Sequence, residues 1–250
     1  MKYNTKTILF IIMKKVSIII ATYNAVKTLH VALNSVQNQN FLDWECIIVD
    51  GASKDGTVEV VKYFSENDSR YRWVSEPDGG VYNAFNKGWR MAKGEWVYYL
   101  GADDELLPNT FKSIFEKQIE DCDVIYGNYL TNSQGKVEII KSHSNPSFLR
   151  KNNTSHQAVI MRRKVIEDLK GFDERYNLCA DYDILVRAYL KPYIFKYVDI
   201  DFAIFTIGGI SSKSLGTESW NIRRRNKTVN LFVNTWVLLK RLLVHCLHNE

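Results

Sequence analysis

The feature that most constrains the fold is a regular series of short apolar runs in the first hundred residues. These runs cover residues 16–20, 46–50, 71–75 and 96–100. Between them apolar residues recur at helical spacing, as at Leu29, Leu33 and Val36. Strand and helix in this alternation form a parallel sheet with right-handed crossovers, and near-continuous apolar strands are typical of sheets covered on both faces. The sequence predicts an α/β, Rossmann-like fold with a mostly parallel central sheet flanked by helices.

The regular alternation ends near residue 108. The later pattern predicts a helix over 109–119, a hairpin of 124–130 and 137–141, a helix over 180–190, strands over 193–198 and 202–207, and a long helix over about 218–247. We therefore expect one compact domain over 14–215, with halves 14–108 and 109–215. An N-terminal extension, 1–13, precedes it, and a C-terminal helical segment, 216–250, follows it.

Charge and cysteine content limit the partners and the compartment. The net charge is +5, but residues 221–241 hold six Lys/Arg and no acid, so the rest of the chain is close to neutral. This argues against a nucleic-acid partner and favours a local anionic one, such as a membrane face. The four cysteines are scattered without a CxxC pair, which favours a reducing, cytoplasmic compartment. No run reaches the roughly 20 apolar residues that span a bilayer.

Polar loops follow all four predicted strands, and ligands of parallel sheets bind where such loops meet. They read ATYNA, DGASKDGT, EPDGGVYNAFNKG and GADDE. Asp50 ends a strand, from where a carboxylate can reach a nucleoside. Asp78 is expected either to cap the next helix or to bind the ligand, and Asn83 and Asn86 should face the same crevice.

Asp103 and Asp104 are adjacent carboxylates at the end of the fourth run, with Glu105 behind them. Like charges repel unless a cation, a dipole or solvent offsets them. A solvated loop and a divalent metal site are both compatible with this pattern.

Five segments in a fixed order carry a resemblance to a known family. They read SIIIATYNA, IIVDGASKDGT, DGGVYNAFNKG, GEWVYYLGADD and GFDERYNLCADYDILVR. Over about residues 14–210 the chain resembles the inverting family 2 glycosyltransferases of the GT-A fold. The resemblance implies a nucleotide-diphosphate sugar donor, most often a UDP-sugar, and Mg²⁺ or Mn²⁺. It also implies a saccharide or lipid-linked acceptor, and a role in bacterial capsule, exopolysaccharide or lipopolysaccharide synthesis.

The resemblance assigns roles on the donor side. It places Thr22, Tyr23 and Asn24 in the first donor-binding loop and makes Asp50 the nucleoside-contacting carboxylate. Where the family often reads LDADD, this chain reads LGADD, so Gly101 replaces the first acid. Ala102 and Asp103 then contact the donor, and Asp103, with its neighbour Asp104, is the candidate metal ligand, because Mg²⁺ takes carboxylate and phosphate oxygens.

The resemblance also implies the catalytic base. It makes Asp181 the carboxylate that deprotonates the acceptor hydroxyl. Asp183 and Arg187 stand at helical i, i+4 spacing and predict an ion pair. His156, in a family-like HQ segment, is expected at the donor site.

Alternatives remain at this stage. A sugar nucleotidyltransferase would carry a glycine-rich loop after the first strand, whereas ATYNAVKT has no glycine. A non-catalytic nucleotide-sugar-binding protein is compatible with Gly101. The C-terminal helix is expected to contact the inner face of a membrane, to form a homodimer, or to pack on the domain.

Overall fold

The computed structural model describes residues 15–116, 121–208, 216–230, 234–236 and 239. The predicted extension 1–13 lies outside these residues. The described strands are β1 (Val16–Thr22), β2 (Trp44–Asp50), β3 (Tyr71–Ser75), β4 (Trp96–Gly101), β5 (Glu105–Leu106), β6 (Val124–Ser133), β7 (Lys136–Ile140), β8 (Val159–Arg162) and β9 (Phe195–Thr206). The described helices are α1 (Leu29–Gln37), α2 (Thr57–Asn67), α3 (Val81–Met91), α4 (Thr110–Phe115), α5 (Arg163–Asp168), α6 (Ala180–Tyr189), α7 (Thr217–Arg225) and the 3₁₀ turns η1 (Pro146–Arg150) and η2 (His156–Ala158).

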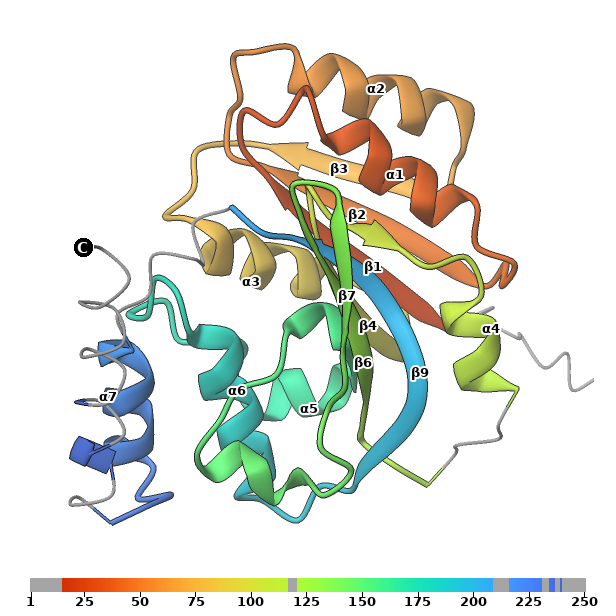
Figure 1. Ribbon diagram of the computed structural model, residues 1–250. Helices are drawn as coiled ribbons and strands as arrows, with labels where there is room; N and C mark the ends of the chain where they lie inside the picture. Colours follow the sequence, from red (N-terminus) through yellow and green to blue (C-terminus); the bar gives the residue numbers. More distant parts are fainter. Residues whose placement is uncertain (1–14, 117–120, 209–215, 231–233, 237–238, 240–250) are drawn as a thin grey trace, which may run out of the picture.

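One mixed sheet runs through the middle of the domain (Figure 1). Within the described residues its order is β3-β2-β1-β4-β8-β6-β9-β5, with β7 paired to β6. The strands β3, β2, β1 and β4 are parallel, as predicted, and the reversed strand β8 joins β4 to β6. The predicted hairpin is confirmed as β6 and β7.

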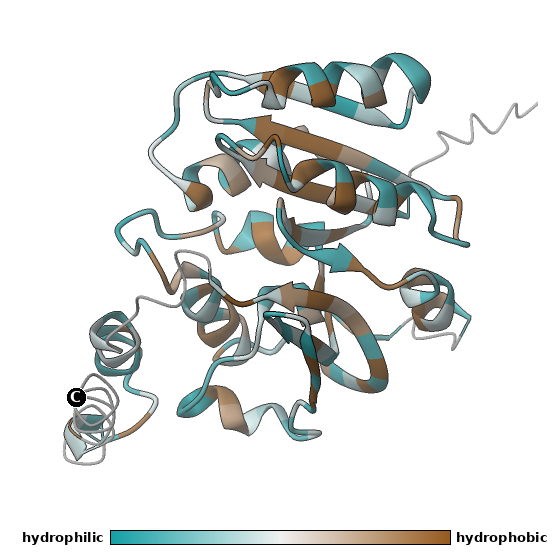
Figure 2. Cartoon of the chain, turned by 45° about the horizontal axis from the view of Figure 1, so that its top comes forward, coloured by the Kyte–Doolittle hydropathy of each residue, from teal (hydrophilic) through white to brown (hydrophobic). Residues whose placement is uncertain are grey.

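Both faces of the sheet are buried, which explains the near-continuous apolar strands. Ile18 and Ile20 of β1 pack with residues of α1, α2 and α4, whereas Ile19 packs with residues of α3, α5 and α6. All three side chains are fully buried, and each burial is worth about 1.5–3 kcal/mol. Figure 2 shows the apolar strands enclosed by helices that are apolar on one side only.

The two strands predicted over 193–198 and 202–207 are one strand, β9, which is a correction. β9 pairs with β6 in parallel, and the pairing shifts register twice, between Tyr126 and Asn128 and between Asn128 and Leu130. These bulges carry the polar residues Asp199 and Asp201 through the sheet without ending it. A polar stretch in the sequence therefore marks a bulge here rather than a turn.

The long helix predicted over about 218–247 is wrong. Helix α7 ends at Arg225, because Lys227 adopts a left-handed conformation with φ 51° and the Thr228 N–H turns back to the Arg223 carbonyl. Ile222 is fully buried against α6, so α7 packs on the domain. Most of the apolar residues beyond 230 lie outside the described residues. In the described part of the chain, no helix has the length and apolarity needed to cross a membrane.

Candidate active site

The carboxyl ends of β1, β2 and β4 lie side by side. Thr22 is in register with Asp50, and Ala21 with Gly101, so the loops that follow these strands share one edge of the sheet. Thr22 is only 4% exposed, and its hydroxyl has no hydrogen-bond partner among the described residues. A buried hydroxyl left in this state costs about 1–3 kcal/mol and is expected where a ligand completes the site.

Asp50 is fully buried at this edge and is held by two serines. Its carboxylate accepts hydrogen bonds from the Ser53 N–H (3.0 Å), from the Ser53 hydroxyl and from the Ser75 hydroxyl (2.6 Å). The Ser53 hydroxyl in turn accepts from the Asn24 N–H at 2.7 Å. Asp50 therefore fixes the first loop from beneath.

The first loop brings Tyr23 and Asn24 to the surface of the edge. The Tyr23 residue is 67% exposed, and Asn24 has a left-handed backbone that its side chain secures by accepting from the Lys54 N–H at 3.0 Å. Gly51 lies beneath Tyr23 and Asp78: a Cβ there would stand 2.9 Å from Asp78 Oδ2 and 3.2 Å from the Tyr23 ring. The structure thus brings Tyr23 and Asp78 together. Asp78 Oδ1 also accepts from the Gly80 N–H at the start of α3 (2.8 Å).

Asn83 and Asn86, expected at the donor, make protein contacts instead. Both side-chain amides donate to Glu174, at 2.8 and 2.7 Å. Asn86 is 2% exposed and also bonds the Phe172 carbonyl, the Phe172 N–H and the Trp89 indole. Because these contacts occupy the whole Asn86 amide, this residue secures the segment before α6 and has nothing left for a sugar nucleotide.

The neighbours Asp103 and Asp104 point in different directions. Asp103 is exposed, and within the described residues its carboxylate accepts no hydrogen bond. Asp104 is 1% exposed and accepts from Gln157 Nε2 (2.5 Å), the Thr206 N–H (3.0 Å) and the Gly101 N–H (3.2 Å). Burial raises the pKa of Asp104, while the Gln157 hydrogen bond acts in the opposite sense. Asp104 is therefore a structural residue, contrary to its assignment as a metal ligand.

The inward turn of Asp104 also explains Gly101. A Cβ at position 101 would lie 2.3 Å from Asp104 Oδ2, so the position has no room for the acid that the family often carries there. The described residues contain no group of three or more His, Cys, Asp or Glu that could hold a metal ion by itself. One free carboxylate, Asp103, suits a cation that takes most of its other ligands from a diphosphate and water.

Asp181 is the second residue of α6 and is held from three directions. Its Oδ1 accepts from the Tyr182 N–H (2.7 Å) and the Tyr82 hydroxyl (3.3 Å), and its Oδ2 lies 3.5 Å from His156 Nδ1. Burial, with the Asp181 charge second, raises the pKa of Tyr82, which keeps that hydroxyl a donor. The predicted pair of Asp183 and Arg187 is confirmed, with Arg187 Nε 2.6 Å from Asp183 Oδ2.

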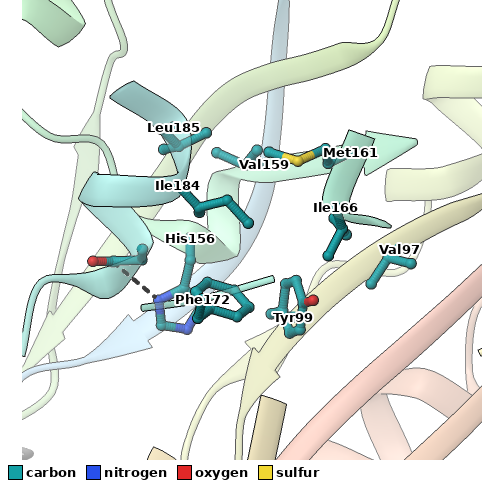
Figure 3. A pocket seen from close by; sticks show the side chains of 10 residues that line it. Val97, Tyr99, His156, Val159, Met161, Ile166, Phe172, Ile184 and Leu185 are labelled. Atoms are coloured by element: carbon teal, nitrogen blue, oxygen red, sulfur yellow. Dashed lines mark ion pairs between the residues drawn. The ribbon is translucent and has the colours of Figure 1, made fainter. Parts of the chain in front are cut away.

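His156 stands beside Asp181, and the next residue, Gln157, bonds Asp104 of the loop after β4. Its ring borders an apolar pocket (Figure 3), and a dashed line in that view marks its ion pair with Asp181. The pocket is lined by Val97, Tyr99, His156, Val159, Met161, Ile166, Phe172, Asp181, Ile184 and Leu185. His156 Nε2 is buried without a partner among the described residues, and so is the Tyr99 hydroxyl. The imidazole therefore contacts Asp181 through Nδ1.

Several positioning residues escaped the sequence analysis. Ser53 and Ser75 hold Asp50, Gln157 holds Asp104, and Glu174 ties down α3. Ser53 lies in a loop already singled out, and Gln157 follows His156 in the HQ segment, so both were within reach of a motif. Nothing in the local sequence distinguishes Ser75 or Glu174, because their partners are 25 and 88 residues away.

Comparison with known sequences defines the protein class. The sequence pattern of glycosyl transferase family 2 matches residues 17–169. A PGL/p-HBAD biosynthesis glycosyltransferase of Mycobacterium tuberculosis is 30% identical over 236 residues, which cover 90% of this chain and 89% of that protein. The chain therefore belongs to glycosyl transferase family 2, and it is an enzyme, a glycosyltransferase. A GalNAc(5)-diNAcBac-PP-undecaprenol beta-1,3-glucosyltransferase of Campylobacter jejuni is 34% identical over 127 residues, 50% of this chain and 41% of that protein.

Solved structures confirm the GT-A fold. Residues 1–349 of S. aureus TarS, in complex with UDP-GlcNAc, superpose with a TM-score of 0.72 at 21% identity, over 91% of this chain and 71% of that one. The mannosyltransferase PcManGT from Pyrobaculum calidifontis, in complex with GDP-Man and Mn²⁺, gives a TM-score of 0.60 at 19% identity, over 84% of this chain and 60% of that one. At these identities the likeness concerns the fold alone.

Proposed function

We propose that the enzyme transfers a sugar from a nucleotide-diphosphate donor, a UDP-sugar first of all, to a saccharide or lipid-linked hydroxyl, with inversion at the anomeric carbon. The observation that carries this proposal is Asp181, a carboxylate held on three sides in a domain whose sheet edge presents Asp103. The relatives support the substrate class, since one is named for PGL/p-HBAD biosynthesis and another for a PP-undecaprenol-linked acceptor. Synthesis of bacterial surface polysaccharide or glycolipid is the corresponding role.

The donor is proposed to lie along the loops after β1, β2 and β4. Tyr23 and Asn24 would contact the nucleoside on a loop that Asp50 fixes through Ser53. The Thr22 hydroxyl, buried and without a partner among the described residues, would gain one from the donor. Asp78 and Ala102 flank the same region and complete the proposed donor contacts.

A divalent cation, Mg²⁺ or Mn²⁺, is proposed to bind with the donor. Asp103 is the residue of this chain that would hold it, because its carboxylate is exposed and Asp104 is fully engaged. Such a cation, when bound, neutralises the charge that develops on a leaving diphosphate. A complex of TarS contains UDP-GlcNAc and one of PcManGT contains Mn²⁺, which supports the ligand classes.

Asp181 is proposed to act as the general base. As the acceptor oxygen bonds to the anomeric carbon, the bond from that carbon to the diphosphate oxygen breaks on the opposite face, and the hydroxyl proton passes to Asp181. Attack opposite the leaving group inverts the anomeric centre. Tyr82 and the Tyr182 N–H orient the carboxylate by donating to one oxygen, and His156 lies beside the other.

A donor screen tests the proposal. The purified chain is incubated with UDP-, GDP- and dTDP-sugars, Mn²⁺ and lipid-linked or free saccharide acceptors, and products are measured by mass spectrometry. We expect one donor class to be consumed with a new glycoside formed. Donor binding without any transfer would favour a binding protein. Release of pyrophosphate from a nucleoside triphosphate and a sugar phosphate would favour a nucleotidyltransferase.

Peripheral contact with the cytoplasmic face of a membrane is proposed as the location. Arg223 is buried and bonded to Asn234, and Arg225 pairs with Asp173, so these two basic residues serve the fold. Arg224 and Lys227 remain exposed, and Trp236 and Leu239 are 59% and 53% exposed. Exposed basic residues, together with exposed aromatic and aliphatic ones in the same C-terminal segment, suit anionic lipid. The double variant Arg224→Glu, Lys227→Glu should weaken flotation with anionic liposomes; unchanged flotation would leave the homodimer as the alternative.

A further inference from the structure

The C-terminal helix α7 reaches the start of the helix that carries the proposed base. Glu218, in the first turn of α7, accepts three backbone hydrogen bonds of 2.9 Å each. The donors are the consecutive N–H groups of Asn177, Leu178 and Cys179, which lead directly into α6. Consecutive N–H groups that converge in this way form an anion site, and here the anion is a carboxylate of the same chain. Glu218 thereby fixes the path of the backbone just before Asp181.

The backbone that leads into α6 is bonded by Glu218 rather than by the N-cap side chain of α6. The N-cap residue is Cys179, which makes no side-chain capping hydrogen bond in the described structure. A negative charge near a helix N-terminus is stabilising; the first turn of α6 carries Asp181 and Asp183, and Glu218 adds a carboxylate from about 40 residues away in the sequence. The base-bearing helix therefore depends on α7 for this part of its N-terminal structure.

Packing joins the same two helices behind the base. Cys179, Tyr182, Val186 and Ile222 form one buried cluster. The Cys179 thiol lies 3.5 Å from the Ser219 hydroxyl, next to Glu218. This cluster occupies the side of α6 that carries Tyr182, whereas Asp181, Ile184 and Leu185 line the pocket. Helix α6 is thus held between the pocket and α7.

We propose that α7 is a working part of the catalytic centre and that Glu218 is a positioning residue for Asp181. The C-terminal segment, expected from its sequence to be an appendage, holds the 177–179 backbone in place, and that backbone sets where the base meets the acceptor hydroxyl. The inference rests on the proposed function for its kinetic consequence. Misplacing a catalytic group by about 1 Å costs on the order of 100-fold in rate, so Glu218 should act on kcat rather than on donor affinity.

The test compares Glu218→Ala and Glu218→Gln with Asn221→Ala, an exposed change on the same helix. We expect Glu218→Ala to lower kcat about 100-fold, with the donor Kd within about twofold of wild type. Glu218→Gln should recover part of kcat, because its amide oxygen still accepts from the backbone, and Asn221→Ala should match wild type. A wild-type kcat in Glu218→Ala, equal losses of kcat and donor affinity, or no recovery in Glu218→Gln would each overturn the proposal.

Hydrogen exchange separates this inference from the proposed function. If wild type transfers no sugar, the proposed function fails. Hydrogen exchange of the amides of 177–183 then shows by itself whether Glu218 positions α6. Faster exchange in Glu218→Ala than in Asn221→Ala, confined to this segment, would support the positioning of α6 by Glu218. The same protection in both variants, or exchange that rises throughout the domain, would overturn it.

Discussion

The edge proposed to bind the donor and helix α6, which carries the proposed base Asp181, are assembled by different kinds of contact. At the donor edge, Asp50 is held by Ser53 and Ser75, which are 3 and 25 residues away in the sequence. Asp181 is instead held by Tyr82, 99 residues before it, and its helix by Glu218, about 40 residues after the capped backbone. Neighbouring strand–helix units are enough to hold Asp50, whereas Asp181 and its helix need contacts with two distant segments. Mutations in one region should therefore change donor affinity, and mutations in the other should change kcat or stability, without affecting both.

The largest expected effect separates chemistry from donor binding. Asp181→Asn keeps the shape of the side chain but cannot take a proton, so kcat should fall by about 10²–10⁴. The donor Kd, measured by calorimetry with Mn²⁺ present, should stay within about twofold of wild type, because Asp181 lies outside the donor-side loops. An equal loss of donor affinity would show that Asp181 also contributes to donor binding, so that the two regions are not separable.

Asn86→Ala should destabilise the region around Phe172 and α6 without weakening donor binding. It removes the partners of the buried Phe172 N–H and carbonyl, so the free energy of unfolding should fall by about 2–3 kcal/mol. Urea unfolding measures this, with Asn83→Ala as the control, since Asn83 is more exposed and, within the described part of the chain, its side chain bonds Glu174 alone. Weaker donor binding by the variant, with an unchanged free energy of unfolding, would instead indicate that Asn86 binds the donor.

Asp103→Asn should affect the donor side alone. Losing the exposed Asp103 carboxylate should weaken donor binding about tenfold in Mn²⁺ while leaving binding in EDTA unchanged, because the amide is a poorer ligand for a hard cation. The same titration of Asp104→Asn serves as the contrast, since that variant should lose stability while its metal dependence remains. Equal Mn²⁺ dependence in Asp103→Asn and wild type would remove Asp103 from the proposed cation site.

The smallest expected effect is the pH-dependent stability contributed by Asp173, which pairs with Arg225 of α7. Hydrogen bonds from Arg175 first, and from Arg225 of α7, hold the pKa of Asp173 well below its ordinary value. Because the folded pKa is below the unfolded one, this stabilisation is present above about pH 4 and is lost as the pH falls further. Asp173→Asn should cost about 1 kcal/mol at pH 7. The unfolding free energies of variant and wild type should converge on acidification; a constant difference down to pH 2 would contradict the assignment.

The same contrast explains how much could be predicted from the sequence. Strand β3 begins and ends where the apolar run 71–75 placed it, and the loops after β1, β2 and β4 share an edge, because period and connectivity are local properties. The resemblance to the family also singled out Asp181, which the structure places beside Tyr82 and His156.

Local pattern could not predict which polar side chains turn inward. Asp104 and Asp103 look equivalent in the sequence, yet within the described residues only the Asp104 carboxylate accepts from Gln157, 53 residues away, and from the Thr206 N–H, 102 residues away. Asn86 was expected at the donor because its helix faces the crevice, but the Phe172 backbone occupies it. The C-terminal helix was predicted too long because apolar residues continue past Lys227, whose left-handed turn depends on packing against the domain.

The stereochemistry of the product tests the central claim most directly, that Asp181 deprotonates an acceptor hydroxyl in a single displacement. The accepted donor, with its sugar in α-linkage to the diphosphate, is turned over by the wild-type enzyme, and the anomeric proton coupling of the glycoside is read by NMR before any mutarotation. The account predicts a β-glycoside as the initial product. An α-glycoside would contradict it, since retention requires a different reaction path in which Asp181 is not the base for one inverting step.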